Sequence, residues 1–231
     1  MARTRQLATE DSGTTRNRLI EAGLDIFGVH GFAAATTRTI ADRAGVNLAA
    51  IPYHFGGKEG LYNAVIEFIV TTVQQNLTPI VSGINERLGD PALTREEASA
   101  LLDELLSALI DFIVGSPQAS RFSRIILREQ MTPSNSYASI YRGVMQPTLT
   151  VIARLVGIIT GRGFTEESQI RAFMFTGQIM AFRFARETLV RAIGIGGYSA
   201  EETRMIRQLI IEQTRAALAG LQQQGKAMPD P

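Results

Sequence analysis

Apolar residues recur at steps of three and four along most of the chain, which is the spacing of one face of an α-helix. The first stripe begins after Thr14 and ends at Gly31, and its members are Leu19, Ala22, Gly23, Ile26, Phe27 and His30. The alternation of apolar and polar residues that would predict strands is not seen. The pattern therefore predicts an all-α protein.

Two short helices are expected next. Thr36 or Thr37 can cap a helix over 37–44, and Asn47 can cap a second helix over 48–55 after a glycine turn. Two short helices joined in this way have the geometry of a helix-turn-helix, whose second helix enters the major groove of DNA. Ordinary packing of helices explains the same pattern, so both interpretations stay open at this point.

Pro52 lies inside the second of these helices, as its fifth residue. An interior proline costs about 3 kcal/mol, because it removes an N–H and its ring crowds the carbonyl four residues earlier, here that of Leu48. In so short a helix only one regular bond is lost, since the first turn has unpaired N–H groups anyway. We expect the helix to survive, tightened to a 3₁₀ turn near Leu48 and anchored by Ile51 and Phe55.

Longer helices are expected in the rest of the chain, namely 58–76, 138–160 with a kink at Pro147, 166–193 and 200–223. The last two carry apolar stripes that would form a four-helix interface between two subunits. The stripes consist of Ile170, Phe173, Met174, Gly177, Ala181 and Phe184, and of Met205, Ile206, Leu209, Ile210, Gln213 and Ala217. A monomer core is the alternative use of the same stripes.

Composition narrows the possible functions. The 231 residues are 45% hydrophobic with a net charge of +1, so nucleic-acid binding must rest on a local patch. The absence of cysteine excludes disulfides and thiolate metal sites, and His30 and His54 are the only histidines, so neither metal nor cofactor is expected. The sequence contains no constellation typical of an enzyme. It also has no signal peptide and no apolar run of about 18 residues, so a cytoplasmic protein is expected.

The segment TTRTIADRAGVNLAAIPYHFGGKEGLYNAVI resembles the N-terminal domain of TetR-type transcriptional regulators, within a match from Arg16 to Ile66. The runs FSRIILREQM and GQIMAFRFARETLVR are similar to the subgroup with a CecR-like C-terminal domain. The resemblance implies a three-helix DNA-binding domain that contains the helix-turn-helix, followed by a larger helical domain for ligand binding and dimerisation. We accordingly expect a flexible N-terminal arm over 1–13, the DNA-binding domain over 14–66, the effector-binding and dimerisation domain over 67–223 and a flexible tail over 224–231.

The resemblance also implies which residues contact DNA. Phosphate contacts and groove contacts are expected from Thr37, Arg38, Asn47, Leu48, Ala49, Pro52, Tyr53, His54 and Lys58, with Arg43 as a further candidate for the DNA backbone. Pro52 departs from the family pattern, in which a polar or aromatic side chain is common. Base reading is therefore expected to rest on van der Waals contacts, on Asn47 and on DNA shape.

By the same resemblance, the expected function is a ligand-responsive repressor that binds a palindromic double-stranded DNA operator as a homodimer and is released by a small-molecule effector. A hydrophobic or aromatic effector is expected. Its candidate contacts are Arg128, Tyr141, Gln178 and Arg183, although Arg183 and Glu187 have the spacing of an i,i+4 ion pair. The alternative is a helical small-molecule-binding or scaffold protein that does not bind DNA.

Overall fold

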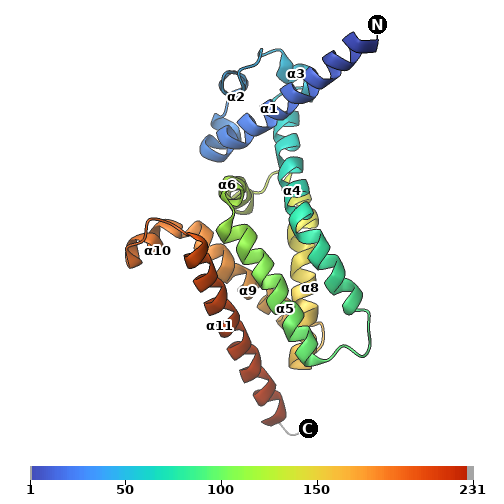
Figure 1. Cartoon of the computed structure of the whole chain (residues 1–231), viewed down its shortest axis with the longest axis vertical. Coiled ribbons are helices and arrows are strands. Elements are labelled where there is room, and N and C mark those ends of the chain that lie inside the picture. Colours follow the sequence, from blue (N-terminus) through green and yellow to red (C-terminus); the bar gives the residue numbers. More distant parts are fainter. Residues whose placement is uncertain (1, 228–231) are drawn as a thin grey trace. The chain divides into compact units, whose positions relative to one another are not determined.

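The computed structural model describes the backbone of residues 2–227 and the side-chain environments of residues 13–223. Every regular element in this part is a helix, which confirms the predicted all-α class (Figure 1). The elements are α1 (Ala2–Ala34), α2 (Thr37–Ala44), α3 (Ala50–Phe55), α4 (Lys58–Arg87), α5 (Arg95–Ile110), the π-helix η1 (Asp111–Gly115), α6 (Pro117–Met131), α7 (Tyr137–Ile140), the π-helix η2 (Tyr141–Met145), α8 (Gln146–Thr160), α9 (Glu166–Phe184), α10 (Arg186–Ile193) and α11 (Ala200–Ala227).

Contacts divide the chain into two compact units. The amino-terminal unit comprises Met1–Thr72 and Arg121–Tyr141, and the carboxyl-terminal unit comprises Val73–Ser120 and Arg142–Pro231. This division differs from the sequence boundary between 66 and 67, because most of α6 and all of α7 group with the amino-terminal helices. Both α4 and α6 run from one unit into the other.

The core of the amino-terminal unit is formed where α1 packs against α2 and α3. Its fully buried side chains include Leu19, Leu24, Phe27, Ile40, Ile51, Leu61 and Ile69. The ring of Phe27 meets the edge of Tyr62 of α4 at 5.0 Å between centroids, and Phe68 of α4 meets Phe122 of α6 at 6.0 Å. These contacts hold the helix-turn-helix segment on α1 and α4.

Helices extend into both terminal ranges, 1–13 and 224–231. Residues 2–13 form the first turns of α1, and α11 reaches Ala227. Residue 1 and residues 228–231 lie outside the described residues. The predicted stop at Gly31 corresponds to a break in α1, where the backbone takes φ 77° and ψ 170°.

The predicted end of the fourth helix was wrong, because α4 continues through Pro79 to Arg87. Val81 and Ile84 extend the buried apolar stripe beyond the proline and are 9% and 1% exposed. Their burial offsets the proline penalty of about 3 kcal/mol.

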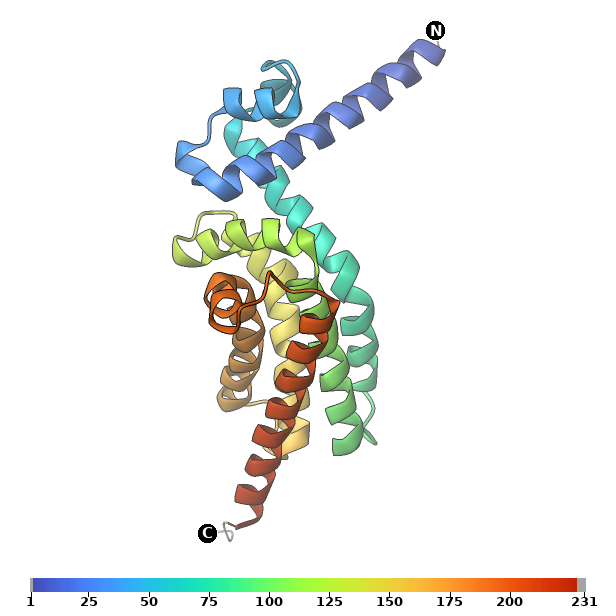
Figure 2. The same cartoon turned by 60° about the vertical axis from the view of Figure 1, so that its left-hand side comes forward.

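The carboxyl-terminal unit is built around α8, which packs against α5, α9 and α11 (Figure 2). The backbone at Gly163 approaches α8 closely at Gly157. A Cβ at Gly157 would lie 2.2 Å from the carbonyl oxygen of Gly163, so only glycine fits there. The stretch Tyr137–Thr160 is long and apolar enough to pass as a membrane span by length and composition. However, α8 buries Val151, Ile152 and much of its remaining apolar surface inside this unit, as the core helix of a globular protein does.

Two predicted long helices are interrupted. The helix expected over 138–160 is divided into α7, η2 and α8, and Pro147 lies in the first turn of α8, where a missing N–H costs little. The helix expected over 166–193 breaks at Ala185, which has φ −101° and ψ 24° and separates α9 from α10.

Candidate DNA-binding surface

Local capping fixes the position of α2. Thr36 is the N-cap, and its side chain accepts a hydrogen bond of 3.1 Å from the backbone N–H of Thr39. Gly45 ends the helix with φ 62°, in the left-handed conformation that glycine adopts without strain. The side chain of Arg18 in α1 donates a 3.0 Å hydrogen bond to the Gly45 carbonyl. The turn is therefore held both by its own sequence and by α1.

The recognition helix α3 begins two residues later than predicted. The N-cap of α3 is Ala49, and Asn47 caps the tight turn before it, because its Oδ1 accepts a 2.9 Å hydrogen bond from the N–H of Ala49. The N–H groups of Ala50 and Ile51 donate to carbonyls three residues earlier, which matches the tightened turn expected near Leu48.

Pro52 is consequently the third residue of α3 and not the fifth. In the first turn of a helix the N–H has no partner inside the helix, so the missing donor of proline costs nothing there. The fully buried Ile51 anchors α3 in the core. The proline is thus placed where it does no harm, and its ring is left on the exposed side of α3.

The exposed face of the helix-turn-helix carries most of the predicted DNA contacts. Leu48 is 40% exposed and Tyr53 is 81% exposed, so a whole aromatic side chain is accessible on this face. Arg38, Asn47, Ala49 and Pro52 are also exposed, and Thr37 is half-buried at the first position of α2. The structure therefore brings these predicted residues onto the two short helices and the turn that joins them.

Lys58 has partners that were not expected from the sequence. Its Nζ donates a 3.2 Å hydrogen bond to the carbonyl of Ala33 and lies 4.6 Å from the centroid of the Phe32 ring. The lysine thus ties the start of α4 to the end of α1. An ammonium group has three donors, so this contact leaves donors for a phosphate.

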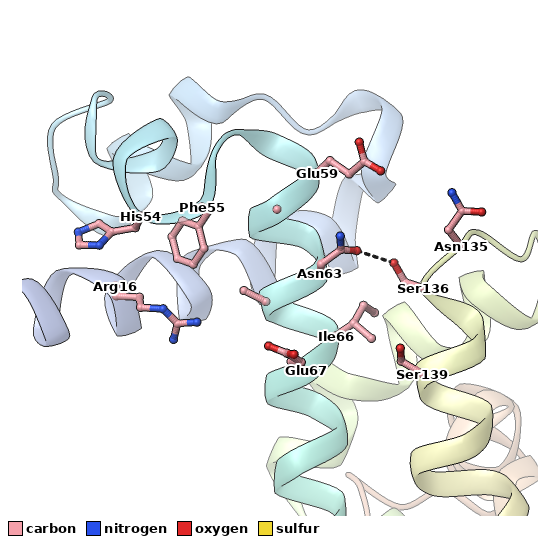
Figure 3. A pocket seen from close by; sticks show the side chains of 12 residues that line it. Arg16, His54, Phe55, Glu59, Asn63, Ile66, Glu67, Asn135, Ser136 and Ser139 are labelled. Carbon is pink, nitrogen blue, oxygen red and sulfur yellow. Dashed lines mark hydrogen bonds between the residues drawn. The ribbon is translucent and has the colours of Figure 1, made fainter.

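A polar pocket of about 480 Å³ lies beside α3 in the amino-terminal unit. Figure 3 shows His54 and Phe55 of α3 on one side and Arg16 of α1 below them. The guanidinium of Arg16 lies 5.4 Å from the centroid of the Phe55 ring. His54 is half-buried and meets the ring of Tyr53 edge-on at 4.9 Å, so it supports the orientation of the exposed tyrosine.

A buried carboxylate joins α4 to α6. Glu129 is only 3% exposed, and it accepts a 2.7 Å hydrogen bond from the hydroxyl of Tyr62. The backbone N–H of Ser134 donates a 3.0 Å hydrogen bond to the same carboxylate. The hydroxyl of Ser134 also donates to this carboxylate and lies 2.8 and 2.9 Å from its two oxygens. Burial, and then the hydrogen bond to Glu129, raise the pKa of the Tyr62 phenol well above its usual value. The phenol is therefore a permanent donor at neutral pH.

Three residues that position the helix-turn-helix were missed by sequence reasoning: Arg18, Asp25 and Arg121. Arg121 of α6 donates to Asp25 of α1 at 2.7 Å, and Asp25 also pairs with Arg43 of α2 at 3.3 Å. Charged residues on the polar face of a helix are common, so these positions carried no distinguishing signal. Only the fold brings together arginines and carboxylates that are up to 100 residues apart.

The predicted effector contacts are divided equally between the two units. Arg128 and Tyr141 belong to the amino-terminal unit, where Arg128 donates a 2.9 Å hydrogen bond to the carbonyl of Val29. Tyr141 stacks on Tyr137 at 6.4 Å between ring centroids. The remaining two candidates, on α9, belong to the other unit.

Arg183 of α9 has a structural role instead of the predicted i,i+4 pair with Glu187. Its guanidinium donates to the carbonyls of Ile113 and Val114 in η1 and to that of Ser116, at 2.8, 3.0 and 3.1 Å. It therefore satisfies carbonyls that the end of a helix leaves unpaired. Burial lowers the pKa of Arg183 relative to that of an exposed arginine. Glu187 pairs with Arg186 and Arg191.

The predicted dimerisation stripes are partly core and partly surface. On α11, Ile206 and Ile210 are buried within the unit, which corrects their assignment to the interface. The other apolar members remain exposed, with exposed fractions of 54% for Ile170, 65% for Phe173, 53% for Met174, 41% for Phe184, 57% for Met205 and 56% for Leu209. The protomer thus leaves an apolar face on α9 and α11 uncovered.

Comparison with known proteins identifies the class. Residues 19–65 match the family described as bacterial regulatory proteins, tetR family, and residues 98–221 match the C-terminal domain of the HTH-type transcriptional dual regulator CecR. CecR of Shigella flexneri is 30% identical over 209 residues, which are 90% of this chain and 93% of that protein. The HTH-type regulatory protein RaaS of Mycobacterium tuberculosis is 26% identical over 156 residues, or 65% of this chain and 70% of that protein.

The fold has counterparts among solved structures. A TetR-like transcriptional regulator from Rhodococcus sp. RHA1 has a TM-score of 0.61 at 18% identity, covering 89% of this chain and 96% of that one. An all-α chain with an exposed helix-turn-helix face and these relatives is a DNA-binding transcriptional regulator. It belongs to the TetR family, with a C-terminal domain of the CecR type.

Proposed function

We propose that the protein is a repressor that binds a palindromic operator as a homodimer and is released by a small-molecule effector. It acts in the cytoplasm, where it meets chromosomal DNA. In this scheme residues 14–66 read DNA, and residues 67–223 bind the effector and dimerise. The single observation that carries the proposal is the exposed tip of α3, where Tyr53 is 81% exposed beside Pro52.

The geometry of this tip supports reading of the major groove. Leu48, Ala49 and Pro52 offer apolar contacts suited to a thymine methyl group, and the side-chain amide of Asn47 offers a donor. Thr37 and Arg38 at the start of α2 are placed for phosphate, where backbone N–H groups also point outwards. Tyr53 and His54 reach the flanking backbone, and Lys58 adds a cation at the start of α4.

The uncovered apolar face of α9 and α11 supports the homodimer. Exposed contiguous apolar patches mark interaction sites, and a twofold contact between identical patches is self-complementary. Two α9–α11 pairs would form a four-helix interface. A twofold dimer places two copies of α3 about one DNA turn apart, or a multiple of that, so the operator is expected to be palindromic.

The effector is proposed to be hydrophobic or aromatic, because the interior of the carboxyl-terminal unit is formed by leucine, isoleucine, valine and phenylalanine. Gln178, half-buried on α9, is kept as a contact. Arg128, Tyr141 and Arg183 are less suited, since each already has a partner in the structure. Release requires the effector to favour a conformer that does not fit DNA, by about 5.5 kcal/mol for a nearly complete switch.

The test is fluorescence anisotropy with a labelled duplex from the intergenic DNA upstream of the gene. Wild-type protein should bind this duplex more tightly than unrelated DNA, and Tyr53→Ala should weaken binding by about tenfold or more. Phe164→Ala is the matched control, because Phe164 is an exposed aromatic residue, 54% exposed, in the carboxyl-terminal unit. Wild-type protein that does not distinguish the two duplexes would contradict the proposal.

The Lys58→Ala variant tests whether Lys58 contacts a phosphate or only packs against the end of α1. If Nζ meets a phosphate, this substitution weakens binding to all sequences and lowers the slope of log K against log salt by about one unit. If the lysine only holds Ala33 and Phe32, the affinity falls together with thermal stability and the slope is unchanged.

A further inference from the structure

One arginine of α6, Arg121, pairs with two carboxylates of α1. Nη1 of Arg121 lies 2.7 Å from Oε2 of Glu21, and its Nε lies 2.7 Å from Oδ1 of Asp25. Nη2 of the same guanidinium donates to the main-chain carbonyl of Glu21 at 3.1 Å. Burial by itself would lower the pKa of Arg121, but the hydrogen bonds to the two carboxylates raise it. The guanidinium therefore remains charged and held by α1.

Asp25 is shared with the helix-turn-helix. Its second oxygen, Oδ2, lies 3.3 Å from Nη2 of Arg43 in the last turn of α2. The side chain of Arg43 is 63% exposed, whereas those of Asp25 and Arg121 are each 33% exposed. The ion pair between Asp25 and Arg121 is therefore shorter and less exposed to solvent than the ion pair between Asp25 and Arg43. An exposed pair of this kind breaks at little cost when a stronger partner arrives.

The charge balance depends on Arg121. Glu21, Asp25, Arg43 and Arg121 carry two negative and two positive charges. Without Arg121 the two carboxylates would outnumber Arg43, the only remaining cation of the cluster. Asp25 would then hold Arg43 more strongly, and the local negative charge would repel DNA phosphates.

Arg121 lies in the second turn of α6, which begins at Pro117. The three helices concerned, α1, α2 and α6, are tied together at one shared carboxylate.

We propose that Arg121 is a positioning residue that controls DNA affinity by competing with Arg43 for Asp25. With Arg121 in place, Arg43 is free to leave Asp25 for a phosphate. Without Arg121, Asp25 retains Arg43 and DNA binding weakens. This inference rests on the proposed DNA-binding function and adds a residue outside the helix-turn-helix that sets the strength of one phosphate contact.

The experiment measures affinity and salt slope for the labelled upstream duplex with full-length variants. Arg121→Met should weaken binding about fivefold or more, in the range of known coupling between sites, and lower the salt slope by about one unit as the Arg43 contact is lost. Arg124→Met is the control, since it removes the same charge one turn along α6, where the arginine packs on Gly28. It should leave the slope unchanged.

Rescue distinguishes competition from a merely structural clamp. Asp25→Asn in the Arg121→Met background should restore affinity and slope, because the competing charge is gone. A structural clamp predicts further damage from the second substitution, and that outcome would overturn the inference. Arg43→Met combined with Arg121→Met should weaken binding no more than Arg43→Met alone.

Asp25→Asn in the wild-type background keeps the test open if Arg121→Met does not fold. Arg121 retains Glu21 in this variant, and Arg43 is released, so affinity should equal or exceed that of the wild type. A loss of affinity of more than about threefold, beyond the usual effect of a surface substitution, would refute the competition. Wild-type protein that binds no DNA would instead reject the proposed function itself.

Discussion

The two units differ in how far they bury the apolar stripes of their helices. In the amino-terminal unit the apolar stripes of α1, α2 and α3 turn inwards, and Leu19, Ile40 and Ile51 are each 0% exposed. In the carboxyl-terminal unit, α9 and α11 keep side chains such as Phe173 and Met205 more than half exposed. The first unit therefore buries the stripes of its short helices, whereas the second unit leaves several apolar members of its α9 and α11 stripes exposed, which suits contact with another apolar surface.

Charged side chains connect separate helices in both units. In the amino-terminal unit, Arg121 of α6 pairs with Asp25 of α1, and Glu129 of α6 accepts from Tyr62 of α4. In the carboxyl-terminal unit, Arg215 of α11 pairs with Asp103 of α5, and Arg183 donates to main-chain carbonyls. The units therefore differ in where apolar surface is exposed and not in the kind of polar contact they use.

The largest expected effect is on the proposed dimer. Replacing Phe173 and Met205 by glutamate places charges on the uncovered face of α9 and α11, and burying an unpaired charge costs several kcal/mol. We expect the double variant to sediment as a monomer in analytical ultracentrifugation and to lose operator binding, with its helical content retained.

Ile193→Glu is the control for this prediction, because Ile193 is 57% exposed on α10, outside the stripe. A double variant that sediments like the wild type would show that this face does not form the interface.

A smaller effect is expected from the buried hydrogen bond of α6. Tyr62→Phe removes one donor from the carboxylate of Glu129, and a hydrogen bond to a charged group contributes about 1.5–3 kcal/mol to stability. We expect a lower free energy of unfolding in urea. Tyr137→Phe is the control, since Tyr137 stacks on Tyr141 at the rim of the same unit.

The same residue predicts a pH dependence. The pKa of Tyr62 is raised in the folded protein, so its contribution to stability is fully present below the ordinary tyrosine pKa of about 10 and is lost as the pH rises beyond it. The difference in melting temperature between wild type and Tyr62→Phe should therefore shrink above about pH 10. A difference that grows with alkalinity would contradict the assignment.

The smallest effect on stability is expected from removing one helix N-cap in each unit. Thr36→Ala and Thr165→Ala each remove an N-cap hydrogen bond, and each should cost about 1 kcal/mol of stability. Thr36→Ala should also weaken DNA binding, because it loosens the start of α2, while Thr165→Ala should not. Thermal melts and anisotropy on both variants provide the measurement, and equal losses of DNA affinity would remove the distinction between the units.

Much of the amino-terminal unit could be predicted from the sequence, because its signals are local. The cap at Thr36, the turn at Gly45 and the break at Gly31 act through bonds within a few residues, and all three are present in the structure. The position of Pro52 was wrong by two residues, since a tight turn with bonds from Ala50 and Ile51 to carbonyls three residues earlier precedes the regular part of α3.

By itself, the sequence determined the helical class, the helix-turn-helix and the family, because helical periodicity, caps and a contiguous motif are properties of neighbouring residues. The tertiary structure alone decided that α4 continues through Pro79, that Arg183 binds carbonyls and that Arg121 shares Asp25 with Arg43. These outcomes depend on pairings between residues distant in the chain, such as the 96 positions between Asp25 and Arg121. No local pattern encodes such pairings, because their energy exists only once the helices have packed.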